Sequence, residues 1–465
     1  MKNPMSRLRP LPLATMLLCV TQFGRAFAAE LHVPVQYPTI QQAVDAAVSG
    51  DTVRIAAGDY TEQVVVAFKT GLTLAGGPGT VLHASPGMRA TLAAYGWSHY
   101  PVCAIYRSDV VVSGLHFEGG SLGGSFPVTL DGLLLLGGGG VVTNCTFSDF
   151  RAVGTGSSSA ARAVYCYNWV NTGTGLVSVT FTGNTFTNNI TALRLAGDPN
   201  SANPGQLRLT VRVHGNTIIG FGPYPGWNAG IFLNCGVTGD VTENFVSDFV
   251  ATGSVIAPAV VAYDGSVSIH GRWVPLQPLN FDGNTLTNNG HIMILIGANG
   301  SRIVNNKFTV AVPGVDSWGG LQVSGTNVQV ANNNFADMPI GTVLLNGTES
   351  WVPSIPPAAN ISLIGNWFCN VPEPILVKSQ VTVLQEHGSE TNFPFAPRFQ
   401  SITSSNGVTQ ALLRGWHGDS YVIETSTNFQ HWAPVHTNRM TLPLFELEHT
   451  NTPVGPHRFY RALKQ

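Results

Sequence analysis

The chain has 465 residues, of which only 10% are charged, and its formal net charge is −2 at pH 7. Its 23 basic residues form no basic cluster, so the sequence gives no reason to expect nucleic acid as a partner. The low charge and the 52 glycines are typical of stacked strands and turns, and they argue against a fold of salt-bridged helices.

Residues 1–28 are typical of an export signal. A positively charged start precedes an apolar stretch from Leu11 to Val20, and Ala26-Phe27-Ala28 is a small-x-small cleavage site. The apolar stretch is too short to span a membrane, and no later segment is long enough. We therefore expect an exported monomer, located in the periplasm, at the cell surface or outside the cell.

Residues 31–62 predict a short helix that covers one end of the fold. Thr39 and Gln42 form a capping box, and Ile40, Val44 and Ala47 line one face of the helix. A solenoid needs such a cap, because otherwise its last apolar layer and its strand edges face water. The stretch resembles the opening of pectin methylesterases and of many other secreted β-helix proteins, which implies a fold but no particular reaction.

Residues 63–150 contain short apolar runs that predict irregularly spaced strands, at 64–66, 72–74, 110–112 and 133–136. The segment 89–107, which includes Tyr95, Trp97, His99 and Tyr100, is interpreted as an excursion from these strands.

A Gly-Asn-Thr-Phe motif at 183–186 returns along the chain, each time between two short alternating apolar runs. Its asparagines are Asn184, Asn216, Asn244, Asn284, Asn306, Asn333 and Asn366, and Leu115 and Cys145 hold this position in looser copies. Period-2 alternation indicates strands, and the irregular spacing indicates a solenoid with insertions. Stacked coils place equivalent residues about 4.8 Å apart, so the amides predict a hydrogen-bonded asparagine ladder.

This repeat resembles the right-handed parallel β-helix of the pectate-lyase-like superfamily over residues 31–385. We therefore predict an all-β fold, in which a right-handed parallel β-helix solenoid (29–385) carries an N-terminal capping helix. A linker (386–398) and a small β-sandwich-like domain (399–465) follow. The last segment, with Tyr421 to Asn428, Trp432 and the terminal Arg-Phe-Tyr-Arg, resembles a module at the end of secreted planctomycete and verrucomicrobial proteins. Carbohydrate binding, attachment and capping all remain open for it.

Five cysteines follow the predicted signal, namely Cys103, Cys145, Cys166, Cys235 and Cys369. Their odd number and irregular spacing argue against a disulfide framework or a zinc site. We expect buried thiols, with a bridge between neighbouring coils as the alternative.

A recurring strand, for example residues 161–167, 192–196 and 230–234, is expected to turn alternate side chains outward. Val164, Leu193, Ile231, Ile292 and Ile294 are expected to point inward. The opposite parity, together with insertions on both sides of the strand, predicts a groove that binds a polysaccharide or glycan. Its predicted substrate-binding residues are Tyr165, Tyr167, Phe232, Asn234 and Gln322, and Met293 is expected to share their face. The alternative is that these rings only favour strand formation.

Three aspartates, Asp198, Asp240 and Asp264, follow the groove strand on successive coils. Carboxylates one or two coils apart fall within the separation of about 5–9.5 Å that glycoside hydrolases use. They also suit Ca²⁺, and a Ca²⁺-assisted lyase would use Arg194 or His291 as its base. However, Asp-Pro at 198 and Asp-Gly at 264 are also ordinary turn dipeptides. A second candidate site is His270-Gly271-Arg272-Trp273, in the longest insertion.

The catalytic motifs of pectin methylesterases, polygalacturonases and pectate lyases have no counterpart here, so fold resemblance does not supply catalytic residues. Two hypotheses follow. The first is an exported polysaccharide lyase or glycoside hydrolase that works in the groove, with catalytic residues among Asp198, Asp240, Asp264, Arg194 and His291. The second is a non-catalytic surface or adhesion solenoid that binds glycan.

Overall fold

The computed structural model describes the chain from residue 28 onward, with gaps. The described residues are 28–91, 99–152, 161–168, 175–197, 207–234, 236–252, 257–262, 277–309, 320–345, 357–377, 382–387, 390–391, 397–405, 408–414, 420–439, 444–450 and 458–465. Among them, no helix is long and apolar enough to cross a membrane. The predicted signal segment lies almost wholly outside these residues.

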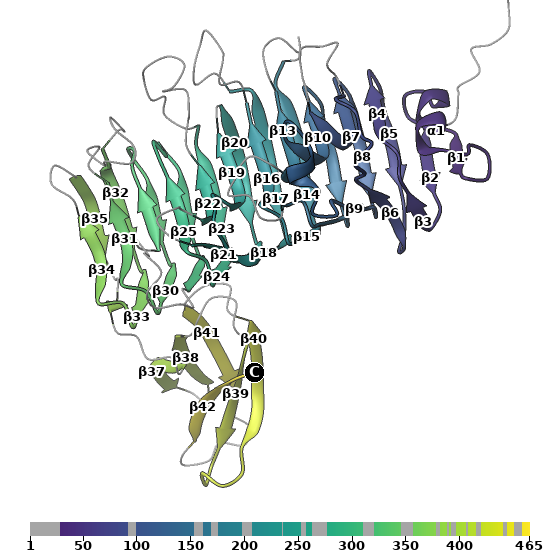
Figure 1. Ribbon diagram of the computed structural model, residues 1–465. Helices are drawn as coiled ribbons and strands as arrows, with labels where there is room; N and C mark the ends of the chain where they lie inside the picture. The colour runs from purple at the N-terminus through teal and green to yellow at the C-terminus, as the bar shows by residue number, and fades with distance from the viewer. Residues whose placement is uncertain are drawn as a thin grey trace, which may run out of the picture.

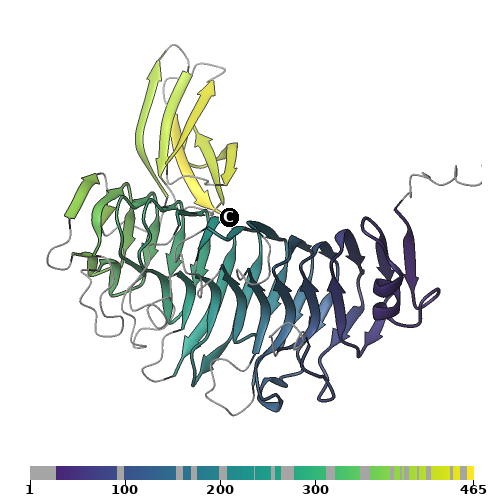
Figure 2. The same ribbon diagram turned by 90° about the horizontal axis from the view of Figure 1, so that it is seen from above.

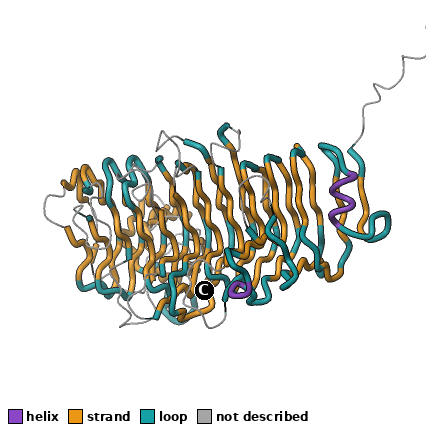
Figure 3. The backbone as a smooth tube through the Cα atoms, turned by 45° about the horizontal axis from the view of Figure 1, so that its top comes forward, coloured by secondary structure: helices purple, strands orange, loops and turns teal. Residues whose placement is uncertain are grey.

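The chain winds into a right-handed parallel β-helix with three long parallel sheets, as predicted (Figure 1). Each coil passes through the 13-stranded, the 12-stranded and the 11-stranded sheet in turn, for example through β14 (Val177–Thr182), β15 (Thr185–Thr187) and β16 (Thr191–Ala196). Figure 3 shows the strands stacked along the axis.

The strands of the three sheets, in spatial order, have the following bounds. The 13-stranded sheet consists of β1 (Glu30–Val33), β2 (Thr52–Ile55), β5 (Thr70–Ala75), β8 (Asp109–Ser113), β11 (Gly139–Thr143), β14, β17 (Leu209–His214), β20 (Val237–Thr242), β23 (Leu279–Asp282), β26 (Arg302–Val304), β29 (Gln329–Ala331), β32 (Ala359–Ile364) and β35 (Thr382–His387). The 12-stranded sheet consists of β3 (Gly58–Tyr60), β6 (Thr80–His83), β9 (His116–Glu118), β12 (Thr146–Ser148), β15, β18 (Thr217–Tyr224), β21 (Phe245–Ala251), β24 (Thr285–Thr287), β27 (Lys307–Thr309), β30 (Asn334–Ala336), β33 (Trp367–Cys369) and β36 (Glu390–Thr391). The 11-stranded sheet consists of β4 (Val64–Ala67), β7 (Tyr100–Tyr106), β10 (Leu130–Leu136), β13 (Ala161–Tyr167), β16, β19 (Ala229–Asn234), β22 (Pro258–Ala262), β25 (His291–Leu295), β28 (Leu321–Val323), β31 (Ile340–Leu344) and β34 (Glu373–Val377).

The predicted asparagine ladder runs through the bend before the 12-stranded sheet. From Asn184 to Asn366, each side-chain amide donates to the side-chain oxygen of the next ladder asparagine at 2.9–3.0 Å. Each amide also donates to a backbone carbonyl of a preceding coil, as Asn284 Nδ2 does to Val241 O at 2.8 Å. Cys145 occupies the same position, and its backbone N–H donates to Asn184 Oδ1 at 2.9 Å. The ladder therefore satisfies buried polar groups that no strand pairing reaches.

The interior is a continuous apolar core with aromatic rings stacked from coil to coil. The rings of Phe117, Phe147 and Phe186 follow one another at centroid distances of 4.8 and 4.9 Å. The four described cysteines, Cys103, Cys145, Cys166 and Cys369, are free and buried, as expected, and Cys235 lies outside the described residues. Burial raises the pKa of the Cys103 and Cys166 thiols to about 12, which keeps them protonated and unreactive.

The predicted capping helix is α1 (Ile40–Ala46), at the N-terminal end of the solenoid (Figures 1 and 3). Thr39 accepts a hydrogen bond from the backbone N–H of Gln42 at 3.2 Å, as the capping box predicts. The Glu62 carboxylate accepts from the N–H groups of Ile40 and Gln41. Ile40, Ala43 and Val44 are buried in the solenoid core, so the helix covers the first apolar layer.

The C-terminal segment forms two three-stranded antiparallel sheets, which project from one side of the solenoid (Figure 2). Their strands are β37 (Arg398–Ser405), β38 (Val408–Arg414) and β41 (Leu444–Thr450) in one sheet, and β40 (Ala433–Arg439), β39 (Ser420–Ser426) and β42 (Phe459–Lys464) in the other. Leu413 and Leu447 of the first sheet share a core with Tyr421 and Ile423 of the second, which makes a small sandwich. Because β35 and β36 still pair with solenoid strands, the solenoid continues past its predicted end at residue 385.

Candidate functional site

The outer face of the 11-stranded sheet carries the predicted sugar-binding side chains in two rows. Tyr165, Arg194 and Phe232 are register partners on β13, β16 and β19, and Gln322 lies further along the same row. Tyr167 and Asn234 share the next outward row. The period-2 pattern therefore predicted this alignment correctly.

The same face is not the solvent-open groove that we expected. Tyr165 is 7% exposed, Phe232 3% and Gln322 3%, while Tyr167 and Asn234 are also buried. Leu134 and Leu136, which share these outward rows, are fully buried. Alternation along a strand shows which side chains point away from the core, but it does not show whether other parts of the chain cover them.

His291 and Met293 lie differently from the prediction. Ile292 and Met293 both pack into the solenoid core, and Ile294 points outward in their place. Two successive residues point inward at the start of β25. From Met293 onward, each side chain therefore points to the face opposite to the predicted one. His291 is buried at the start of the strand, three strands from Arg194, or about 14 Å along the sheet. The two predicted bases therefore do not lie in one site.

The three aspartates are not brought together by the described residues. Asp240 lies in β20 of the 13-stranded sheet, where its Oδ1 accepts from Asn280 Nδ2 at 3.0 Å. It was expected shortly after the groove strand. Because β19 ends at Asn234 and β20 begins at Val237, this position belongs to the next sheet. Asp198, Asp264 and the segment 270–273 lie outside the described residues.

A charged cluster missed by the sequence analysis lies beside Tyr165. Asp131 on β10 accepts from Arg162 Nε on β13 at 2.7 Å, and its other oxygen is 2.8 Å from His99 Nδ1, just before β7. Arg162 Cζ is 3.9 Å from the centre of the Tyr165 ring, and the His99 ring is 5.7 Å from it. Three neighbouring coils thus place a histidine, a carboxylate and a guanidinium around one aromatic ring.

Asp131 organises this cluster because it is fully buried yet ionised. Burial raises the pKa of Asp131, but the Arg162 charge and the hydrogen bonds from His99 and Arg162 outweigh it and lower the pKa below its usual value. The carboxylate is therefore an acceptor, and the His99 Nδ1–H donates to it. This tautomer places the imidazole lone pair on Nε2, as a general base requires.

Arg194 adds a second guanidinium to this face. Its Cζ is 5.4 Å from the centre of the Tyr165 ring and 5.0 Å from that of Phe232. Its Nε is buried, and among the described residues it has no hydrogen-bond partner. A buried guanidinium donor normally has an acceptor. The arrangement can therefore accept an anionic group beside Tyr165, where a carboxylate would supply the missing acceptor.

The cluster has a weak signal in the sequence. Asp131 and Arg162 each precede an apolar strand core by one residue, in LDGLLLL and ARAVYCY. A charged residue at the same place in successive strands indicates a cross-strand ion pair, but only if the register of the two coils is known. The insertions between these strands hide that register.

Replacing Asp131 with asparagine should lower the free energy of unfolding by about 3–5 kcal/mol at pH 7, because Arg162 would be buried without its counter-charge. Since the folded pKa of Asp131 is lowered, its stabilisation is present above the unfolded pKa of about 3.9 and is lost as the pH falls through the folded pKa. Urea denaturation at pH 7 and at about pH 3 checks both statements. Asp109→Asn, at an exposed site, is the control, and an equal loss in both variants would contradict the prediction.

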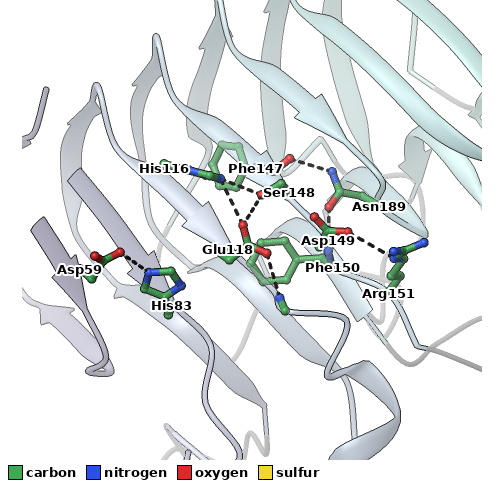
Figure 4. Close-up of polar contacts among 11 residues, drawn as sticks. Asp59, His83, His116, Glu118, Phe147, Ser148, Asp149, Phe150, Arg151 and Asn189 are labelled. Carbon is green, nitrogen blue, oxygen red and sulfur yellow. Dashed lines mark hydrogen bonds and ion pairs between the residues drawn. The ribbon is translucent and has the colours of Figure 1, made fainter. Parts of the chain in front are cut away.

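Figure 4 shows a second polar cluster, which lies on the 12-stranded sheet. Ser148 Oγ donates to Glu118 Oε2 at 2.9 Å and accepts from His116 Nε2 at 2.7 Å. Burial lowers the pKa of His116 and raises that of Asp149, whose pKa the nearby Glu118 raises further. Because the serine proton points to a carboxylate and not to the histidine, Ser148 is not activated as a nucleophile. We interpret this cluster as a bridge between coils.

The described residues contain no group of three or more His, Cys, Asp or Glu side chains that could hold a metal ion. The predicted Ca²⁺ site depends on Asp198 and Asp264, which lie outside those residues, so it stays a prediction.

No protein-family model matches the chain, and no curated protein matches it. Among solved structures, the Dettilon tailspike protein is 14% identical, with 85% of this chain and 77% of that chain covered and a TM-score of 0.43. A periplasmic alginate epimerase is 8% identical, with 78% and 83% covered and a TM-score of 0.39. A mannuronic acid specific polysaccharide family 6 lyase from human gut microbiota is 13% identical, with 78% and 82% covered and a TM-score of 0.36. At these TM-scores the likenesses carry no argument about activity.

Proposed function

We propose that this protein is an exported carbohydrate-active protein that binds an acidic polysaccharide at the outer face of the 11-stranded sheet and cleaves it as a lyase. The observation that carries the proposal is Arg194, whose buried Nε has no acceptor among the described residues. The aromatic rings on either side hold its guanidinium in place, and the guanidinium suits a uronate carboxylate. Export is inferred from the signal-like residues 1–28.

In the proposed reaction, Arg194 pairs with the carboxylate of the uronate and stabilises the negative charge that develops when the C5 proton is removed. His99 Nε2 takes that proton, because Asp131 holds Nδ1–H and stabilises the imidazolium that forms. The C5–H electron pair forms the C4–C5 double bond, the C4–O bond breaks, and the released oxygen takes up a proton. Arg162 keeps Asp131 ionised and in place.

The number of carboxylates in the charged cluster favours lyase chemistry over hydrolysis. A glycoside hydrolase needs two carboxyl groups on either side of the bond it cleaves. The charged cluster contributes one carboxylate, Asp131, which is fully buried and already engaged by His99 and Arg162. Asp240, the only predicted catalytic aspartate in the described residues, belongs to another sheet.

The test is incubation of the purified protein with acidic polysaccharides (polygalacturonate, alginate) and with neutral ones. We expect new unsaturated uronate ends, seen by ultraviolet absorbance, from an acidic polymer only. Arg194→Ala should raise KM about 10- to 150-fold, which corresponds to a lost charge-assisted hydrogen bond of about 1.5–3 kcal/mol. Because Arg194 supplies the positive charge, chelation of Ca²⁺ should leave turnover unchanged. Absence of unsaturated ends from every acidic polymer would contradict the lyase proposal.

The low exposure of Tyr165, Phe232 and Gln322 favours a second candidate, a non-catalytic surface or adhesion protein. A face that admits only part of a glycan can bind it without positioning a bond for cleavage. Binding of an acidic polymer without turnover, weakened by Arg194→Ala but unchanged by replacement of His99, would support this candidate over the lyase.

A further inference from the structure

Two large residues occupy a backbone conformation that normally requires glycine, at the ends of β4 and β7. Phe68 has φ 56° and Arg107 has φ 45°, and on the next coil the position after β10 is Gly137, with φ 59°. The left-handed conformation costs an L-residue roughly 1–2 kcal/mol, whereas glycine adopts it freely. Strain of this kind persists where the surrounding structure holds the residue in place, and it is a reason to ask what the side chain does.

The two side chains are presented to solvent as one unit. Phe68 is 57% exposed and Arg107 is also exposed. Arg107 Cζ lies 5.6 Å from the centre of the Phe68 ring, and the ring of Tyr106 packs edge-on against Phe68 at 5.4 Å. The result is an exposed aromatic ring, held by a buried tyrosine and flanked by a positive charge. We call Phe68 and Arg107 the outer pair.

The outer pair continues the face that holds the candidate site. Tyr106 is in register with Leu136 and then with Tyr167, so the two tyrosines are two strands apart, or about 10 Å. The Tyr167 ring is 5.5 Å from the Tyr165 ring. Tyr106, Tyr165 and Tyr167 belong to one buried cluster, which joins the outer pair to the cluster around Asp131.

The guanidinium of the outer pair favours an anionic ligand. Lys69 follows Phe68 and donates its ammonium group to the Ala47 carbonyl, and Asp109 is the nearest acidic residue in the sequence. The Lys69 charge interacts with Asp51, whose pKa it helps to lower, so the guanidinium of Arg107 is the cation that lies beside the exposed ring. A sugar ring with a carboxylate matches both features, since its apolar face covers an aromatic ring and its charge pairs with a guanidinium.

We propose that Phe68 and Arg107 form an outer subsite for a uronate unit of the polysaccharide that binds at Arg194. This proposal rests on the proposed function, because it takes the same ligand and places a further sugar of the chain three or four coils toward the N-terminus. The subsite would increase affinity for long chains and would take no part in the chemical step.

The test uses Phe68→Gly and Arg107→Gly in the full-length protein, with sodium polygalacturonate and alginate, and short oligouronates prepared from them, as ligands. Each variant should weaken binding of the long polymers about three- to tenfold and leave binding of the shortest oligomers unchanged. Arg107→Gly should also reduce the salt dependence of polymer binding. Because glycine relieves the left-handed strain, the melting temperature of Phe68→Gly should not fall.

Phe429→Gly is the matched control, because Phe429 is also an exposed phenylalanine with positive φ but belongs to the C-terminal sandwich. It should leave polymer binding unchanged.

If Arg194→Ala weakens binding while Phe68→Gly and Arg107→Gly do not, the outer subsite is wrong and the proposed function stands. A loss of melting temperature in Phe68→Gly without loss of affinity would assign Phe68 a structural role. If the unchanged protein binds neither polymer, both proposals are wrong.

Discussion

Replacing His99 with glutamine should lower turnover of the acidic polysaccharide by about 10²- to 10⁴-fold, which is the usual contribution of a general base. Glutamine keeps an amide donor for the Asp131 carboxylate, so the buried ion pair with Arg162 should survive. What glutamine lacks is a basic nitrogen to take up the C5 proton. The loss should therefore appear in kcat, with little change in KM, because Arg194 still binds the substrate.

The matched control for this prediction is His83→Gln. His83 also contacts an aspartate, with Nε2 2.7 Å from Asp59 Oδ1 (Figure 4). It lies on the 12-stranded sheet, whereas Arg194 lies on the 11-stranded sheet. This variant should turn over the polymer at the unchanged rate. Thermal melting of both variants shows whether the fold is intact. A folded His99→Gln protein that keeps more than about a tenth of the turnover would remove His99 from the mechanism.

Replacing Asn284 with leucine, in the middle of the asparagine ladder, should lower the free energy of unfolding by about 3–9 kcal/mol. Asn284 Oδ1 accepts from both the backbone N–H and the side-chain amide of Asn244, each at 3.0 Å. Its own amide donates to Val241 O and Asn306 Oδ1. Leucine would leave two buried donors and one buried carbonyl without partners, and each unpaired group costs about 1–3 kcal/mol.

Urea denaturation measures this loss, and two further variants define its cause. Asn280→Ala removes an amide four residues away on the same coil, where it bonds to the exposed Asp240, and should cost less than about 1 kcal/mol. Asn366→Leu, further along the ladder, should cost about as much as Asn284→Leu, because it leaves the Asn333 N–H, the Asn333 amide and the Val330 carbonyl without this partner. Equal losses at Asn284 and Asn280 would show that the ladder does not stabilise the fold.

The sequence predicted the ladder because every coil repeats the same local requirement. A tight bend leaves backbone groups that strand pairing cannot reach, and an asparagine amide satisfies them from either neighbour. Leucine occurs at Leu115 and cysteine at Cys145. The Cys145 N–H donates to Asn184 Oδ1, and its thiol donates to the Val112 carbonyl. Repetition along the chain thus carried the information about stacking.

The candidate site was predicted only in part, for reasons that particular residues show. Tyr165, Arg194 and Phe232 were placed correctly because they share one strand position in consecutive coils. Met293 and Ile294 were exchanged because a one-residue irregularity reverses alternation without a clear sequence signal. Asp240 does follow β19, but it lies in β20 of the next sheet, which a short turn enters directly.

The sequence by itself determined the β-helix and its N-terminal cap. Strand alternation and the recurring asparagine are local patterns that the coils repeat, and the capping box is a local pattern of the first helix. Only the tertiary structure decided which charged residues meet. More than 30 residues of sequence separate His99 from Asp131, and again Asp131 from Arg162. The three side chains meet because stacking brings their coils within hydrogen-bonding distance. The tertiary structure also decided that the outer face is buried, because exposure depends on contacts between segments that no single coil encodes.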